Sequence, residues 1–411
     1  MALTRISTDG VKDDAVTVDK MASNSVGSSQ IINTGVSTDD IANQAVNADK
    51  IANNTITTLK IGDNQITTTK VADDAITQAK INVPLSNHSL VVNGDMKLAQ
   101  RGASSTGNGY QTVDRFALYK FAIGNTLTQS QISLNSTDTG PYALGFRKAY
   151  RFAAAGALTA NNNSEISMSH KIEAQDIASS GWDYTSSSSY ITLSFWFRCS
   201  ANQTFYCYLK TDDGTSQSYP FSFTASGNNT WTKITKTIPG DSNLQFDDNE
   251  GEGLFMAFVP FFGTNYTGTK TLNAWSAYAN DARVPDMAND VWYAGANTFD
   301  ITGVKLEVGA TDTTFQHLSY GESLAKCQRY YQEGYFRIRL NGRSSNNVSE
   351  FTHYFKGTMR TGPTCTTSNE LGTIASINDP DGYLGGNGIY IDFTAALSNN
   401  FAARVFADAE L

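Results

Sequence analysis

Aromatic residues stand beside polar, loop-like residues at several places after residue 180, and this combination could bind sugars. A sugar ring stacks its C–H face on an exposed aromatic ring, while nearby Asn, Asp, Gln and Arg side chains hydrogen-bond to its hydroxyl groups. The candidates are Trp182, Tyr184, Trp275, Tyr278, Trp292, Tyr293 and, on the predicted outward face of a strand, Trp196. The alternative is that each ring packs at a sandwich edge or between subunits.

A second chemical candidate is the acidic stretch FDDNEGEG, which contains Asp247, Asp248, Glu250 and Glu252. Its carboxylates could bind Ca²⁺ or supply the paired acids of a glycoside hydrolase. The spacing is not that of an EF-hand, and a solvated loop is the simpler interpretation.

Other chemistry is disfavoured. The sequence contains no G-x-S-x-G, H-E-x-x-H or P-loop motif, and its four histidines stand singly. The four cysteines have neither metal-ligand nor C-x-x-C spacing, so reduced thiols are expected. We therefore predict no enzyme activity and no cofactor.

Charge and hydropathy exclude further partners. The net charge is −9, from 30 basic and 39 acidic residues, which disfavours nucleic acid because phosphate binding needs a basic face. No stretch approaches the roughly 18 apolar residues of a membrane span, so no membrane insertion is expected. The start of the chain lacks a signal-peptide pattern, which predicts synthesis in a cytoplasm.

The candidate rings need a rigid support, and the sequence predicts a β-sandwich. Short apolar runs such as YITLSFWFRCS, FYCYLK, LFMAFVPFF and FDITGVKLEVG alternate with turn-forming clusters. In the first run, Ile191, Leu193, Phe195 and Phe197 should face the core and Trp196 should face outward. A short amphipathic helix is predicted from Glu322 to Tyr331, followed by a small β-rich domain.

Roughly the first 82 residues are different, because they repeat every ten positions. One column of aliphatic residues runs through positions 11 to 81, and a second, five residues apart, runs from 6 to 76. A step of five fits neither a helix nor a strand. If Thr57 caps a helical turn, then Ile56 and Ile61 occupy the two positions of a hydrophobic staple. Each decad is therefore interpreted as one capped turn followed by an Asn/Asp-rich bend.

Two aliphatic residues per decad bury too little area to order a single chain. We expect three copies to share a thin core; its members are Ile41, Val46, Ile51, Ile56, Ile61, Ile66, Val71, Ile76 and Ile81. A monomeric solenoid and a disordered linker are the alternatives.

Several of these motifs resemble those of phage tail-fibre proteins. LVVNGDM is similar to the first strand of xylanase-type carbohydrate-binding jelly rolls. KLEVG, the later SYGESLAKCQRYYQ and the terminal ADAEL look like the junction and tip of such fibres, and the decads look like the stalks of marine or cyanobacterial phage fibres.

The resemblance implies a mainly β fold in three parts: a decapeptide-repeat stalk (1–82), a jelly roll (83–320) and a β tip with an initial short helix (321–411). It implies a homotrimeric virion fibre, bound to other virion proteins through its N-terminal part, that adsorbs to a host-surface polysaccharide without cleaving it. A purely structural capsid or collar fibre and a depolymerising tailspike are the alternatives.

Overall fold

The structure is a computed structural model that describes residues 17–23, 41, 45–52, 55–57, 60–62, 65–71, 88–287, 292, 295–339, 348–371, 374–378, 385–394 and 400–411. The chain divides into two units, residues 1–82 and 83–411, and each is described by itself. No helix within the described ranges is long and apolar enough to cross a membrane.

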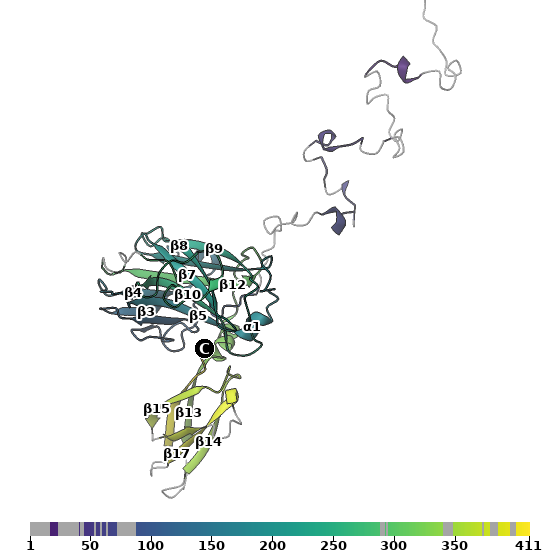
Figure 1. The fold of residues 1–411 in the computed structure, drawn as a ribbon. Helices are drawn as coiled ribbons and strands as arrows, with labels where there is room; N and C mark the ends of the chain where they lie inside the picture. Colours follow the sequence, from purple (N-terminus) through teal and green to yellow (C-terminus); the bar gives the residue numbers. More distant parts are fainter. Residues whose placement is uncertain are drawn as a thin grey trace, which may run out of the picture. The chain divides into compact units, whose positions relative to one another are not determined.

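The larger unit is built on a sandwich of two six-stranded antiparallel sheets (Figure 1). The first sheet has the order β1 (Ser104–Ser105), β3 (Leu127–Ser133), β4 (Lys148–Ala154), β12 (Thr298–Val308), β6 (Tyr190–Cys199) and β9 (Thr232–Pro239). The second has the order β11 (Ser276–Ala277), β8 (Gln217–Thr224), β7 (Thr204–Thr211), β10 (Glu252–Phe262), β5 (Glu165–Glu173) and β2 (Ala117–Phe121). This arrangement confirms the predicted mainly β jelly-roll fold.

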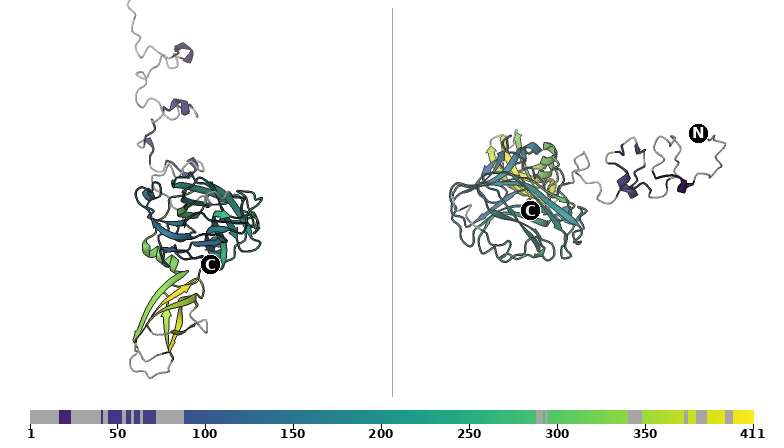
Figure 2. Two further views of the ribbon diagram at one scale, coloured as in Figure 1. Left: turned by 90° about the vertical axis from the view of Figure 1, so that its left-hand side faces the viewer. Right: turned by 90° about the horizontal axis from the view of Figure 1, so that it is seen from above.

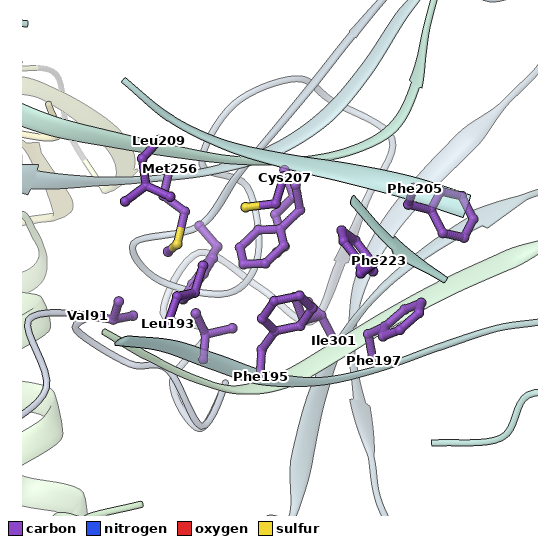
Figure 3. Packing of buried hydrophobic residues seen from close by; sticks show 14 of the residues in the cluster. Val91, Leu193, Phe195, Phe197, Phe205, Cys207, Leu209, Phe223, Met256 and Ile301 are labelled. Carbon is purple, nitrogen blue, oxygen red and sulfur yellow. The ribbon is translucent and has the colours of Figure 1, made fainter. Parts of the chain in front are cut away.

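The core between the two sheets is dominated by phenylalanine. Phe195 and Phe197 of β6 meet Phe223 of β8 and Phe258 of β10 (the sheets are shown close up in Figure 3). The ring centroids of Phe197 and Phe223 lie 4.7 Å apart at 85°, and those of Phe195 and Phe258 lie 4.9 Å apart at 80°. Edge-to-face contacts of this kind add about 1 kcal/mol each to the burial of the rings themselves.

Strand β6 confirms the predicted core face and corrects the predicted outer face. The four predicted core residues from Ile191 to Phe197 are fully buried. On the other side, however, Thr192 and Ser194 are also buried, and Trp196 is half-buried. Alternation in the sequence marks which side faces the core, but a loop that later folds over the other side leaves no trace in that pattern.

The helices in the described part of the chain are short. Helix α1 (Ala174–Ala178) follows β5, and α3 (Tyr320–Gln328) follows the sandwich; 3₁₀ turns lie at η8 (Tyr142–Leu144) and η9 (Gly385–Asn387).

Helix α3 was predicted in the right place with the wrong bounds. It begins earlier because Ser319 forms a capping box: its hydroxyl accepts from the Glu322 N–H, and the Glu322 carboxylate accepts from the Ser319 N–H. It ends before Tyr331, which starts β13 opposite Asp408.

The chain after α3 forms two three-stranded sheets (Figure 2, left, yellow and light green). One has the order β13 (Tyr331–Arg339), β18 (Asn400–Asp408) and β15 (Thr364–Leu371); the other has the order β14 (Val348–Tyr354), β17 (Gly388–Thr394) and β16 (Ile374–Asn378). Phe336, Ile391 and Val405 form a small core of their own.

Among the described residues of the N-terminal unit, three decads contain 3₁₀ turns: η2 (Val18–Lys20), η4 (Ala48–Lys50) and η6 (Thr68–Lys70). Each turn begins directly after the predicted capping position, where the carbonyls of Thr17, Asn47 and Thr67 accept from the lysine N–H at 2.9, 3.1 and 2.9 Å. The lysine ammonium groups also bind the chain's own backbone: Lys50, Lys60 and Lys70 donate to the carbonyls of Ala45, Thr55 and Gln65. Each described decad is therefore closed locally by its lysine.

The predicted stalk-core residues are open in the single chain. Ile41, Val46, Ile51, Ile56, Ile61 and Ile66 are 47, 55, 40, 55, 41 and 57% exposed, and Val71 is half-buried. Ile76 and Ile81 lie outside the described residues.

Candidate functional site

The outer face of the second sheet carries aromatic and charged side chains together. On β10, Leu254, Met256 and Phe258 point into the core, so Phe255 points outward. Phe255 lies opposite Lys210 of β7 on one side and Lys171 of β5 on the other. Directly opposed residues in antiparallel strands share a face, so an aromatic ring is flanked by two ammonium groups.

Glu252 and Tyr278 complete this group. The Glu252 carboxylate lies 2.7 Å from the Lys171 ammonium and 3.8 Å from that of Lys210. The Lys210 ammonium lies 5.7 Å from the centre of the Phe255 ring and 5.5 Å from that of Tyr278. We call these five residues, Lys171, Lys210, Glu252, Phe255 and Tyr278, the Phe255 face.

The Phe255 face is accessible but held in place. The side chains of Lys171, Lys210 and Glu252 are 25, 20 and 14% exposed, and both rings are half-buried. Tyr278 follows β11, and its N–H donates to the Ser216 carbonyl at 2.9 Å. Burial raises the pKa of the Tyr278 hydroxyl, which therefore stays protonated and able to donate.

A segment that crosses the same sheet supports Tyr278. Val284 of this segment packs on Tyr208 and Val259, and Arg283 forms a salt bridge to Glu165 at 2.8 Å. The Arg283 guanidinium also lies 4.6 Å from the Tyr266 ring centre. This segment, which covers part of the sheet, is thus held in place by apolar packing and by a partly buried ion pair.

Chemically, the Phe255 face offers half-exposed rings next to hydrogen-bond donors and an acceptor. Rings of this kind stack on apolar ligand faces, ammonium groups donate to hydroxyl oxygens, and the carboxylate accepts from hydroxyl groups. Across the described ranges, no three His, Cys, Asp or Glu side chains gather into a metal-binding group.

The structure corrects two of the predicted sugar-stacking residues. Trp182 is 3% exposed and packs with Tyr184 and Phe246, and Trp292 is 1% exposed with its Nε1 donating to the Pro260 carbonyl. Neither ring can stack on a sugar in this conformation. Their polar neighbours in the sequence suggested exposed loops, but the indoles themselves point inward, where a large ring buries the most apolar area.

Of the other candidates, only Tyr278 belongs to the Phe255 face. Trp196 is half-buried on the opposite sheet, against the loop at Gly140. Trp275 is half-buried: its Nε1 donates to the Pro239 carbonyl at 2.7 Å and its ring centre lies 5.4 Å from that of Tyr219. Tyr184 is half-buried beside Trp182, and Tyr293 lies outside the described residues.

The acidic stretch does not act as one cluster. Asp247, Asp248 and Glu250 are exposed, whereas Glu252 opens β10 and pairs with the lysines. The structure thus joins Glu252 and Tyr278, which the sequence placed in two unrelated motifs.

Sequence reasoning missed Lys171, Lys210 and Phe255. The sequence did contain a signal for them. Each alternates with core-facing residues along its strand, so its side chain is expected on the outer face of the sheet. It also missed Tyr119 and Phe121, which point outward from the edge strand β2 of the same sheet and are 46 and 52% exposed.

Comparison with known proteins gives distant structural similarity. No protein-family model matches the chain, and no curated protein matches it. A putative sugar binding protein from Bacteroides thetaiotaomicron is similar at 9% identity and a TM-score of 0.30, over 54% of this chain and 100% of that one. The family 11 carbohydrate-binding module of a Clostridium thermocellum cellulase is similar at 11% identity and a TM-score of 0.25, over 51% of this chain and 96% of that one.

The enzymatically active domain of tailspike protein 4 of bacteriophage CBA120 is similar at 9% identity and a TM-score of 0.29. The match covers 54% of this chain but only 21% of the tailspike chain. Scores of this size report resemblance alone.

Proposed function

We propose that the protein binds a polysaccharide without cleaving it, through the Phe255 face. The observation that carries this proposal is the pairing of half-exposed Phe255 and Tyr278 rings with the charged groups of Lys171, Lys210 and Glu252. The rings supply stacking surfaces, and the charged groups supply hydrogen bonds that distinguish one pattern of hydroxyls from another.

Two further features support a long ligand. Tyr119 and Phe121 add exposed rings at the edge of the same sheet face, and they stand two residues apart, so both point outward. A polymer can contact several rings at once, whereas a single sugar cannot span the face.

We further propose that the protein is a subunit of a homotrimeric virion fibre that adsorbs to a host-surface polysaccharide, with its N-terminal part bound to other virion proteins. The six exposed aliphatic residues from Ile41 to Ile66 support self-association, because a lone chain leaves them in water. Three copies would then strengthen weak single-site binding through a high effective concentration.

A glycan array probed with the full chain tests binding. We expect Phe255→Ala to weaken retention on the bound polysaccharide by about tenfold, which corresponds to the loss of one aromatic contact. Tyr354→Ala is the matched control, because Tyr354 is 68% exposed and lies on β14, outside the two sheets of the sandwich. Absence of binding to any host polysaccharide, or equal loss in both variants, contradicts the proposal; release of reducing ends would show an enzyme instead.

A further inference from the structure

A cavity of about 590 Å³ lies away from the Phe255 face, where three segments of the chain meet. The segment that begins at His88 provides one wall, and its Leu90 N–H donates to the Leu306 carbonyl of β12 at 2.8 Å. Helix α1 and the turn after it provide Asp176 and Ser180, and helix α3 and the residues after it provide Lys326 and Tyr330. The volume is within the range of about 300–1,000 Å³ that is usual for small-molecule sites.

The walls of the cavity are held together by buried charge. The Glu173 carboxylate, fully buried before α1, accepts from Arg329 Nε at 2.7 Å, from Arg329 Nη2 at 2.6 Å and from the Tyr330 hydroxyl at 2.6 Å. The Arg115 guanidinium lies 3.4 Å from the Tyr330 ring centre and pairs with Glu410. Separating α1 from α3 would leave buried charges without partners, so the cavity is preorganised.

His88, Asp176 and Lys326 line the cavity, and their side chains make no hydrogen bond or ion pair with any described residue. His88 and Asp176 are exposed, and Lys326 is half-buried. The Ser180 hydroxyl donates to the Ile177 carbonyl at 2.7 Å and accepts from the Trp182 N–H at 3.2 Å, so it is already engaged within the turn. Partial burial and the nearby Lys326 lower the pKa of His88, and partial burial and the nearby Glu173 raise the pKa of Asp176.

The charges in the cavity distinguish between ligand classes. The Arg329 guanidinium is met by Glu173, so among the described residues that line the cavity, Lys326 and Asp176 remain as one charge of each sign without a salt bridge. A phosphate or carboxylate ligand would meet the Asp176 carboxylate, which disfavours anions. Two neighbouring hydroxyl groups suit the pair, because one can donate to the carboxylate while the other accepts from the ammonium.

We propose that this cavity binds one neutral sugar ring, or a similar polyol with adjacent hydroxyl groups, between Asp176 and Lys326. Leu90 and Tyr330 line the cavity but are only 9 and 3% exposed, so hydrogen bonds to Asp176 and Lys326, rather than stacking on a ring, would hold the sugar. The site is separate from the Phe255 face and does not depend on it. The ligand is either a free monosaccharide or the terminal residue of an oligosaccharide, since both present the same hydroxyls.

Saturation-transfer NMR on the full chain tests the proposal, with D-glucose, D-galactose and D-mannose as probes and oligosaccharides ending in the same sugars as a second arm. We expect transfer to at least one of these sugars, and about tenfold weaker affinity in Asp176→Asn and in Lys326→Met, because each removes a hydrogen bond to a charged group. Transfer to the oligosaccharide but not to the free sugar would assign the site to chain ends.

The matched control is Lys356→Met, which removes an exposed lysine that lines neither site. No transfer to any probe, unchanged affinity in Lys326→Met, or preference for D-glucuronate or inorganic phosphate would overturn the proposal. Phe255→Ala should leave monosaccharide binding unchanged. The proposal for the Phe255 face and the proposal for this cavity can therefore be refuted independently of each other.

Discussion

Both outer faces of the sandwich carry charged and aromatic side chains, but on one face these are buried against each other and on the other they remain partly exposed. On the first sheet, Asp300 is fully buried and accepts from Arg151 Nε and Nη2 and from Arg198 Nε, each at 2.7 Å. Arg198 Nη1 also binds Asp138 at 2.6 Å, and Trp231 Nε1 donates to the same carboxylate at 3.1 Å. On the second sheet, the Phe255 face stays partly exposed, and the segment at Arg283 and Val284 covers the neighbouring part of the same sheet.

A second buried pair closes the first sheet. Lys305 and Glu307 are 1 and 0% exposed and lie 3.0 Å apart, and Glu307 accepts from the Thr313 N–H at 2.8 Å. The loop after β12 is thereby fastened over the strand that carries it. The difference between the two faces shows that charged and aromatic side chains indicate a ligand-binding site only where no other group of the protein already hydrogen-bonds to them.

The largest effect is expected on the covered face. Arg198→Met should lower the free energy of unfolding by about 3 kcal/mol, because it leaves Asp138 and Asp300 buried with fewer partners. Urea unfolding measures this, with Arg337→Met, an exposed arginine, as the control. Polysaccharide binding by the folded fraction should not change; a loss of binding without a loss of stability would reverse the assignment of the two faces.

The next largest effect is expected when the trimer is disrupted, because a single chain presents only one Phe255 face to the polysaccharide. Ile56→Asp with Ile61→Asp should abolish trimers in light scattering and weaken apparent polysaccharide binding by about 100-fold. Thr55→Asp with Gln65→Asp places the same charges on exposed residues outside the aliphatic columns. A monomeric mass for the unchanged protein, or trimers in the Ile56/Ile61 variant, would refute the shared core.

A smaller effect is expected from a charge on the open face. Lys210→Met should weaken polysaccharide binding by about threefold to tenfold, since it removes one donor beside the two rings. Stability should change by less than about 1 kcal/mol, because the ion pairs of Lys210 are partly exposed. Calorimetric titration and urea unfolding of the same variant separate the two quantities; a stability loss as large as that of Arg198→Met would show a structural role.

The smallest effects come from acid titration, where the two faces should respond with opposite sign. Burial alone would raise the pKa of Asp138, but bonds from the Asn135 N–H, Trp231 and Arg198 hold it below its ordinary value of 3.8. Its contribution to stability is therefore present above that value and is lost as pH falls through the lowered pKa. Asp138→Asn should remove this loss.

Glu165, beneath the cover of the second sheet, behaves in the opposite way. Burial raises its pKa above 4.5 despite the nearby Arg283, so the folded state holds the proton more tightly. Stability should fall as pH rises from 4.5 through the raised pKa, and Glu165→Gln should remove that fall. Unfolding curves between about pH 1.5 and 7 test both variants; slopes of equal sign would contradict the difference between the two groups.

The sandwich was predictable because burial on one side of a strand imposes alternation. The core side of β6 was identified residue by residue, and helix α3 was found from its amphipathic pattern, although with shifted bounds. The capping box at Ser319 and Glu322 would have given its first residue as well. The exposed aliphatic columns of the N-terminal unit were likewise visible as a ten-residue period.

The candidate site was much less predictable. Trp182 and Trp292 have polar neighbours yet are buried, because a neighbour in sequence says little about the direction of a side chain in a loop. Glu252 and Tyr278 meet only through Lys210, which comes from a third segment. Pairings of this kind depend on strand order, and strand order is not written in any local pattern.

The sequence alone shows two kinds of pattern: an aliphatic ten-residue repeat, and then alternating strands that form a phenylalanine-rich core. Both follow from local periodicity, which hydrophobic burial enforces at every position. The tertiary structure is needed to show that buried ion pairs close one face of the sandwich and that the other face presents Phe255 and Tyr278. This difference depends on loops and strands distant in sequence, because a charged or aromatic side chain acquires its role from the partners that fold over it.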